Sequence, residues 1–222
     1  MDENVQESRV RALLIGRPQS FREDGTQSAM ARSLVSRKLW LSQSGLAGDE
    51  VADTLHHGGP DKALHLYPQE HYAWWRDRIG EHPLLERHGA FGENITANGM
   101  TEDQVCLGDR FRIGGAIIEL SHGRQPCWKL DHHFGRNDMV KQIVASGRCG
   151  LYFRVLEEGA VGTGDAIIRI GRGDGRWSVA ALFAILIAGG HKGQSASLRE
   201  LAAHPLLAEA WRQRAATLLT HA

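Results

Sequence analysis

The sequence predicts an α+β protein: an irregular, mainly antiparallel β-barrel with a few helices, followed by a small three-helix segment. Between residues 105 and 120, short apolar runs are separated by Gly-Asp and Gly-Gly pairs, a spacing typical of hairpins in a barrel-like meander. At residues 171–177 the composition becomes glycine-rich and charged, and helical patterns follow. We therefore expect a β-barrel domain over residues 1–172 and a three-helix domain over residues 177–222.

Each element of this layout has a local signal. Strands are expected at residues 9–15, 38–41, 116–120, 151–156 and 166–170. Helices are expected at residues 68–79 and 137–146, and in the tail at residues 179–188 and 205–219. Pro68 suits the first turn of its helix, where its missing N–H would be unpaired anyway. Ser197 and Glu200 have the spacing of a capping box for a further tail helix.

The composition excludes several classes of protein. The chain has 222 residues, 42% hydrophobic and 23% charged, and its 26 basic residues balance 26 acidic ones. This balance gives no general attraction to nucleic acid or membrane, so we expect neither as a partner. The N-terminus lacks a secretory pattern, and the longest apolar run, residues 179–188, is shorter than the ~20 residues that cross a bilayer. Three widely spaced cysteines without a CxxC pair indicate reduced thiols in a cytoplasmic protein.

Cys127 is the candidate reactive residue, in the stretch "RQPCWKL". Pro126 places it in a loop or at a strand end, where functional groups concentrate. Arg124 and Lys129 would favour the thiolate, which is the form that attacks or binds a metal. The alternative is a small buried hydrophobe, as we expect for Cys106 and Cys149.

The stretch "HHGGPDK" is a candidate anion site. Gly58 and Gly59 allow close approach of backbone N–H groups to phosphate oxygens, and Lys62 adds a positive charge. His57 could ligate a metal or serve as a hydrogen-bonding anchor. The alternative for the whole stretch is a tight turn.

A third stretch, "FGEN", offers the amide of Asn94, whose paired donor and acceptor could read the edge of a heterocycle; the alternative is a turn residue. The common nucleotide-binding and serine-hydrolase motifs are missing from the sequence.

Taken together and in order, "GLAGDE", "HHGGPDKALHLYPQEHY", "FGEN" and "RQPCWKL" resemble the MOSC-domain family, in particular its stand-alone bacterial YiiM-like type. The resemblance covers residues 26–170, and the tail from about residue 177 is similar to the three-helix domain that follows in that type. Four ordered motifs are far more specific than any one alone.

The resemblance implies an irregular β-barrel that binds the molybdenum cofactor, Mo-molybdopterin, with Cys127 as the metal ligand and catalytic residue. The residues expected around the cofactor are His57, Gly58, Gly59, Lys62, Asn94 and Arg124.

The resemblance also implies an oxidoreductase that converts N-hydroxylated compounds, such as hydroxylaminopurine-like bases, to amines in a detoxifying role. Electrons would come from an external partner, because the sequence shows no ferredoxin-like or flavin module. One alternative is a sulfur carrier with a persulfide on Cys127, although the pyridoxal-phosphate desulfurase domain of cofactor sulfurases is missing. Another is a non-catalytic cofactor-binding module in which the tail mediates interactions, and a homodimer is compatible with either.

Overall fold

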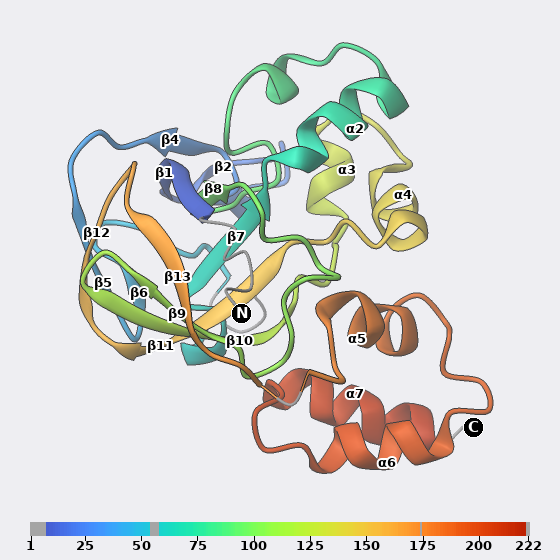
Figure 1. Cartoon of the computed structure of the whole chain (residues 1–222). Coiled ribbons are helices and arrows are strands. Elements are labelled where there is room, and N and C mark those ends of the chain that lie inside the picture. The colour runs from blue at the N-terminus through green and yellow to red at the C-terminus, as the bar shows by residue number, and fades with distance from the viewer. Residues whose placement is uncertain (1–7, 54–57, 174, 221–222) are drawn as a thin grey trace.

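The computed structural model describes residues 8–53, 58–173 and 175–220, and a closed β-barrel forms one side of the molecule, with the larger helices on the other (Figure 1). Within these residues the strands close in the order β13, β9, β10, β11, β7, β8, β1, and β1 pairs again with β13. The strands are β1 (Ser8–Gly16), β7 (Leu64–Pro68), β8 (Ile95–Ala97), β9 (Arg110–Ile113), β10 (Ala116–Gly123), β11 (Leu151–Glu157) and β13 (Ala166–Gly171). The predicted α+β class and the mainly antiparallel barrel are confirmed.

The one parallel pair in this barrel joins β7 and β8, with Leu66 opposite Ile95. A parallel pair needs a crossover connection, and helix α2 (Glu70–Ile79) lies on it. The prediction that Pro68 opens this helix is wrong, because Pro68 is the last residue of β7, opposite Ala97. Proline is tolerated at a strand end, where no ladder N–H is required of it.

The smaller elements surround the barrel. Further strands are β2 (Gln19–Ser20), β3 (Gln27–Ser28), β4 (Arg32–Leu34), β5 (Leu39–Ser42), β6 (Gly45–Leu46) and β12 (Gly159–Val161). Short helices are η1 (Pro60–Lys62), η2 (Pro83–Glu86), α3 (Lys129–His133) and α4 (Met139–Ser146). Asp138 precedes α4, and Gly147 ends it with φ 71°.

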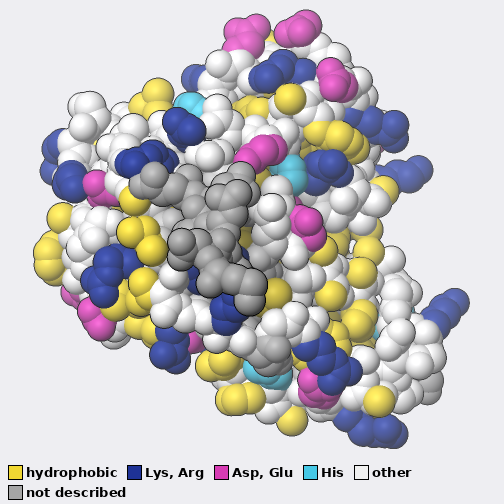
Figure 2. All heavy atoms as spheres, in the orientation of Figure 1, with side chains coloured by type: hydrophobic (Ala, Val, Ile, Leu, Met, Phe, Trp, Pro, Cys, Tyr) yellow, Lys and Arg dark blue, Asp and Glu magenta, His cyan; other side chains and the backbone are white. Residues whose placement is uncertain are grey.

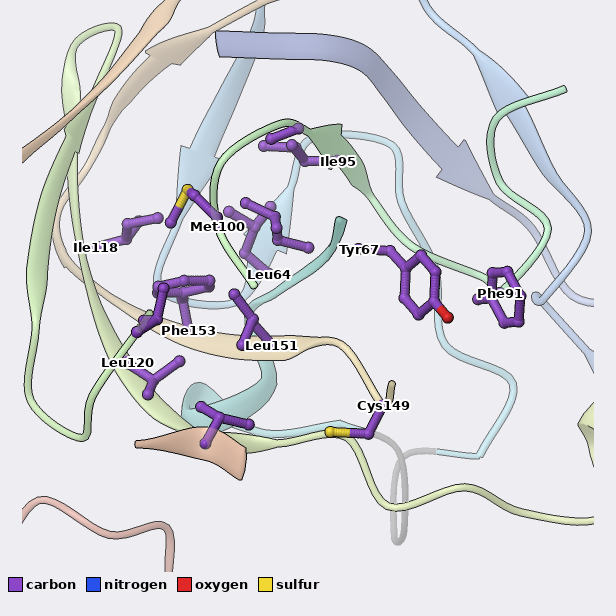
Figure 3. Packing of buried hydrophobic residues seen from close by; sticks show 14 of the residues in the cluster. Leu64, Tyr67, Phe91, Ile95, Met100, Ile118, Leu120, Cys149, Leu151 and Phe153 are labelled. Carbon is purple, nitrogen blue, oxygen red and sulfur yellow. The ribbon is translucent and has the colours of Figure 1, made fainter. Parts of the chain in front are cut away.

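Aliphatic and aromatic side chains fill the barrel (Figure 3). β10 and β7 are buried along their whole lengths, including the polar residues Glu119, His122 and His65. Cys149 lies in this cluster, 1% exposed, and Cys106 is also buried, as expected for inert thiols. Burial raises the pKa of the Cys149 thiol well above its usual range, which keeps it protonated.

The tail forms helices α5 (Val179–Leu186), α6 (Ser195–Ala203) and α7 (Glu209–Leu219). The predicted capping box is wrong, because Ser197 lies inside α6 and donates to the side chain of Gln194. Glu200 instead accepts hydrogen bonds from Arg176 and from the indole N–H of Trp177, 2.7 Å away. The buried side chains of the tail join the same apolar cluster as those of the barrel.

On the face shown in Figure 2, Lys and Arg side chains alternate with Asp and Glu, in keeping with the zero formal net charge. Among the residues that the structure describes, no helix combines the length and the apolar character needed to cross a membrane.

Candidate cofactor-binding and active site

A row of aromatic rings crosses three neighbouring strands of the barrel. His122 on β10 lies opposite Tyr152 on β11, and Tyr152 lies opposite His65 on β7. The ring centroids are 5.2 Å and 4.9 Å apart, and Trp211 of α7 meets His122 edge-on at 5.5 Å. Directly opposed side chains on paired strands share one face of the sheet, so strand register alone assembles this row.

His122 is neutral at physiological pH. Burial lowers its pKa to about 3, and the nearby cations Lys62 and Arg154 contribute. Its Nδ1 atom lies 2.9 Å from the Ser121 hydroxyl, which fixes the ring orientation.

His65 is neutral for the same reason, since burial and the charge of Arg124 hold its pKa well below its ordinary value. Its Nδ1 lies 3.2 Å from the carbonyl oxygen of Gly92, so in the neutral ring this nitrogen carries the proton. The other ring nitrogen, Nε2, is buried without a hydrogen-bond partner.

The loop after β10 begins with a close approach of three chain segments. A Cβ atom at Gly123 would lie 2.8 Å from Cγ1 of Val179 and 3.0 Å from Sγ of Cys149, so only glycine fits there. The next residue, Arg124, donates its backbone N–H to the Gly150 carbonyl at 3.1 Å. This contact anchors the start of the loop that carries Cys127.

Cys127 is half-buried and lines a cleft of about 820 Å³. Its carbonyl accepts a hydrogen bond from Leu130 N–H at 3.0 Å, which holds it against the first turn of α3. The side chains around the cleft that matter below are Lys62, His122, Trp128, Lys129, Tyr152 and Trp211. Trp211 belongs to α7, so the tail forms part of the cleft wall.

A recess of about 80 Å³ adjoins the cleft, and Lys129 and Tyr152 line both. Three cations line the recess: Arg32, Arg124 and Lys129. Arg124 is 7% exposed and Lys129 is 8% exposed. Burial raises the pKa of Tyr152, although Arg124, which hydrogen-bonds its hydroxyl, opposes that shift.

The three cations differ in their partners. Arg32 pairs with Asp49 and donates to the Gly92 carbonyl at 2.8 Å. In the described part of the chain, neither Arg124 nor Lys129 forms an ion pair, and Nη1 of Arg124 is buried without a hydrogen bond. Two carboxylates also line the recess: Glu50, which pairs with Arg17 at 3.8 Å, and Asp53, which acts on Lys62.

The predicted anion stretch is only partly at the cleft. Lys62 lines it, and burial lowers the Lys62 pKa against the opposing charges of Asp61 and Asp53. Gly59 precedes η1 with φ 104°, a conformation that favours glycine, and a Cβ there would meet no atom within 4 Å. Neither Gly58 nor Gly59 is among the described residues that line the cleft or the recess. His57 lies outside the described residues.

Asn94 is 3% exposed, and its amide is occupied by the protein. The carbonyl oxygen accepts from His65 N–H at 3.1 Å, and the amino group donates to Asp49 at 2.8 Å. In this position Asn94 links β7 to the carboxylate that holds Arg32. It therefore positions the recess rather than presenting an edge to a ligand.

Sequence reasoning missed several residues of the site, among them Arg32, His65, His122, Tyr152 and Trp211. The two on strands β7 and β11 carried a signal, since a polar ring within an otherwise buried strand is unusual. Nothing local marks Arg32 or Trp211, because long-range packing brings them to the site.

No group of three or more His, Cys, Asp or Glu side chains suited to a metal ion occurs among the described residues. A metal at Cys127 would therefore need the other ligands of its own cofactor.

The barrel, the half-buried thiol and the adjoining cationic recess define a class: a β-barrel protein able to hold an anionic ligand beside a single cysteine. The chain belongs to the MOSC-domain family, whose model matches residues 53–168. This family is associated with the molybdenum cofactor.

Several known proteins resemble the chain. It is 41% identical over 167 residues to the uncharacterized protein YflK of Bacillus subtilis, covering 74% of each chain. It is 42% identical to protein YiiM of Escherichia coli over 66% of this chain and 65% of that one. A protein of Gibberella moniliformis named Reductase is 35% identical over 68% of this chain, but that match spans only 27% of the fungal protein. The crystal structure of YiiM from Geobacillus stearothermophilus superposes with a TM-score of 0.80 at 32% identity, covering 96% of this chain and 99% of that one.

Proposed function

We propose that this protein binds Mo-molybdopterin with Cys127 on the metal, and that it reduces N-hydroxylated compounds such as hydroxylaminopurine-like bases to amines. The observation that carries the proposal is the pair of buried, unpaired cations, Arg124 and Lys129, beside a half-buried thiol.

The residues present fit an anionic cofactor. A buried charge without a partner costs several kcal/mol, so an uncompensated pair in a recess favours an anion there. Molybdopterin carries a phosphate, which Arg124 and Lys129 would neutralise. Lys62 adds a third cation on the cleft, and the loop at Gly58 and Gly59 remains a proposed neighbour, with His57.

Cys127 would supply the protein's ligand to the metal, because a thiolate sulfur is a soft donor suited to such sites. The bound cofactor would supply the two-electron redox chemistry. Reduction of an N–OH group to an amine consumes two electrons and two protons and releases water.

The protein would contribute proton-bearing side chains on the cleft: Lys62, Lys129 and the hydroxyl of Tyr152. His122 and His65 would act differently. Both side chains are neutral near pH 7. They would therefore form an uncharged aromatic wall that orients a ligand and would not repel a positively charged one.

The electrons would come from a separate protein. The fungal relative named Reductase is much longer than the region that it shares with this chain. This is consistent with electron supply by modules other than the barrel.

The test is to purify the protein from a host that makes molybdopterin and to measure molybdenum and pterin per chain. We expect close to one of each, with molybdenum lost in Cys127→Ala and pterin lost in Arg124→Ala and Lys129→Met. Cys106→Ala and Lys141→Met are the matched controls, since neither residue lines the recess or the Cys127 cleft.

The loaded protein should then convert hydroxylaminopurine to adenine with reduced methyl viologen as the donor. Full molybdenum content in Cys127→Ala would refute the metal assignment. A persulfide on Cys127 without metal would instead favour the sulfur carrier. A loaded protein that reduces no N-hydroxylated compound would leave the non-catalytic cofactor-binding module.

A further inference from the structure

Trp128 is a large aromatic side chain left open beside the candidate reactive thiol. It is 44% exposed, whereas Trp75, Trp177 and Trp211 are 0%, 3% and 2% exposed. Tryptophan is usually buried for most of its surface, and an open one at the edge of a cleft commonly contacts a ligand.

The protein holds this ring in place despite its exposure. The guanidinium of Arg22 lies over it, 5.0 Å from the ring centroid, and the ring of Phe21 lies 6.1 Å away at 55°. His132 adds an edge contact at 6.5 Å. The backbone of Trp128 has φ −52° and ψ −24° at the start of α3, so a helix fixes the Cα position as well.

Trp128 is part of the wall of the cleft that Cys127 lines. Tyr152, the buried ring of His122 and Trp211 from the tail also line this cleft. A cleft whose wall carries several aromatic rings favours a flat, heteroaromatic ligand over an aliphatic one.

We infer that Trp128 determines substrate specificity: the planar ring of a heteroaromatic N-hydroxylated substrate stacks on its indole, inside the cleft that Cys127 lines. The inference rests on the proposed function and narrows its substrate class. Stacking of a base on an aromatic side chain changes affinity by about 10- to 100-fold when the side chain is truncated to alanine.

The decisive measurement compares two substrates, hydroxylaminopurine and the aliphatic N-methylhydroxylamine, in loaded protein. In Trp128→Ala we expect kcat/KM for the purine to fall about 10- to 100-fold and for the aliphatic compound to fall by less than about 3-fold. Trp128→Phe should recover most of the purine activity, because it restores a stacking ring.

Trp40→Ala is the matched control. Trp40 is also exposed, at 53%, but it lies on β5 and outside the cleft, so both activities should be unchanged. Equal losses for the two substrates in Trp128→Ala would overturn the inference. Loss of pterin in that variant would also overturn it, since Trp128 would then hold the cofactor.

A binding measurement separates this inference from the proposed function. Isothermal titration of adenine into the protein purified from a molybdopterin-producing host should show about 10- to 100-fold weaker binding in Trp128→Ala. If no N-hydroxylated compound is reduced, the proposed function fails, yet this loss of adenine binding would still support the stacking role. Unchanged adenine binding in Trp128→Ala would overturn it.

Discussion

Two groups of charged side chains lie close to strands β10 and β11, and they differ in how their charges are compensated. In the first group, Arg154 donates to Glu119 at 2.9 Å, to Asp61 at 2.8 Å and to the Leu206 carbonyl at 2.9 Å. Glu119 also accepts from Arg110 at 2.8 Å. In the second group, Arg124 and Lys129 have no carboxylate partner among the described residues.

The difference distinguishes charges that stabilise the fold from charges that are available to bind a ligand. Every charge of the first group is satisfied within the chain, so that group joins barrel to tail without needing a ligand. In the second group the two cations form no ion pair among the described residues, although Glu50 and Asp53 also line their recess, and such buried cations are costly for an isolated protein and useful for one that binds an anion. The predictions below run from the largest expected effect to the smallest; the first concerns the buried His122 that lies beside both groups, and the others test this contrast.

The first prediction concerns acid. The pKa of His122 is about 3 in the folded protein and about 6.5 in an unfolded chain, so only the unfolded state takes up its proton as the pH falls below 6.5. The stabilisation is complete above pH 6.5 and is lost progressively towards pH 3, by up to about 5 kcal/mol. Urea unfolding between pH 8 and pH 4 should show a shallower pH dependence in His122→Asn than in the wild type. An equal pH dependence of the free energy of unfolding in the two proteins would contradict the lowered pKa of His122.

The second prediction breaks the compensated group. Glu119→Ala leaves Arg154 with a buried, partly unpaired charge, and we expect a loss of about 3 kcal/mol in the free energy of unfolding. Urea denaturation at pH 7 measures it. A loss below about 1 kcal/mol would show that this group is not structural.

The third prediction removes a charge from the uncompensated group. Lys129→Met should leave the ligand-free protein as stable as the wild type, or more stable by about 1 kcal/mol, because an unpaired buried cation disappears. Inorganic phosphate should raise the melting temperature of the wild type and of Lys141→Met, but not of Lys129→Met. A markedly destabilised Lys129→Met would mean that the cation has a partner within the protein.

The fourth prediction is the smallest. The side chain of Arg110 is 54% exposed in its pair with Glu119, so Arg110→Ala should cost less than about 1 kcal/mol, and added salt should reduce even that. A cost equal to that of Glu119→Ala would place both partners in the buried structural group.

The barrel was predictable because its signals are local. Strand signals in the sequence marked β1, β5, β10, β11 and β13, and the paired glycines marked the meander that contains β9. The parallel pairing of β7 with β8 could not be predicted in this way, because β8 has only three residues and the crossover through α2 determines its partner.

The site divides in the same way. The motif residues Lys62 and Cys127 line one cleft, and Arg124 lines the adjoining recess. The row of His122, Tyr152 and His65 depends on the register between strands far apart in sequence, which no local pattern specifies. Asn94 is the opposite case. Its local pattern predicted an amide that contacts a ligand, but hydrogen bonds within the protein occupy that amide.

The placement of α7 has a practical consequence for anyone who shortens or exchanges this tail. The carbonyl of Leu206, which lies just before α7, accepts a hydrogen bond from Arg154, and the ring of Trp211 contacts that of His122 at the wall of the cleft. A chimera in which the last forty or so residues come from a relative would therefore change the shape of the cleft that Cys127 lines. Its substrate selectivity should resemble that of the protein that supplied the tail rather than that of the protein that supplied the barrel.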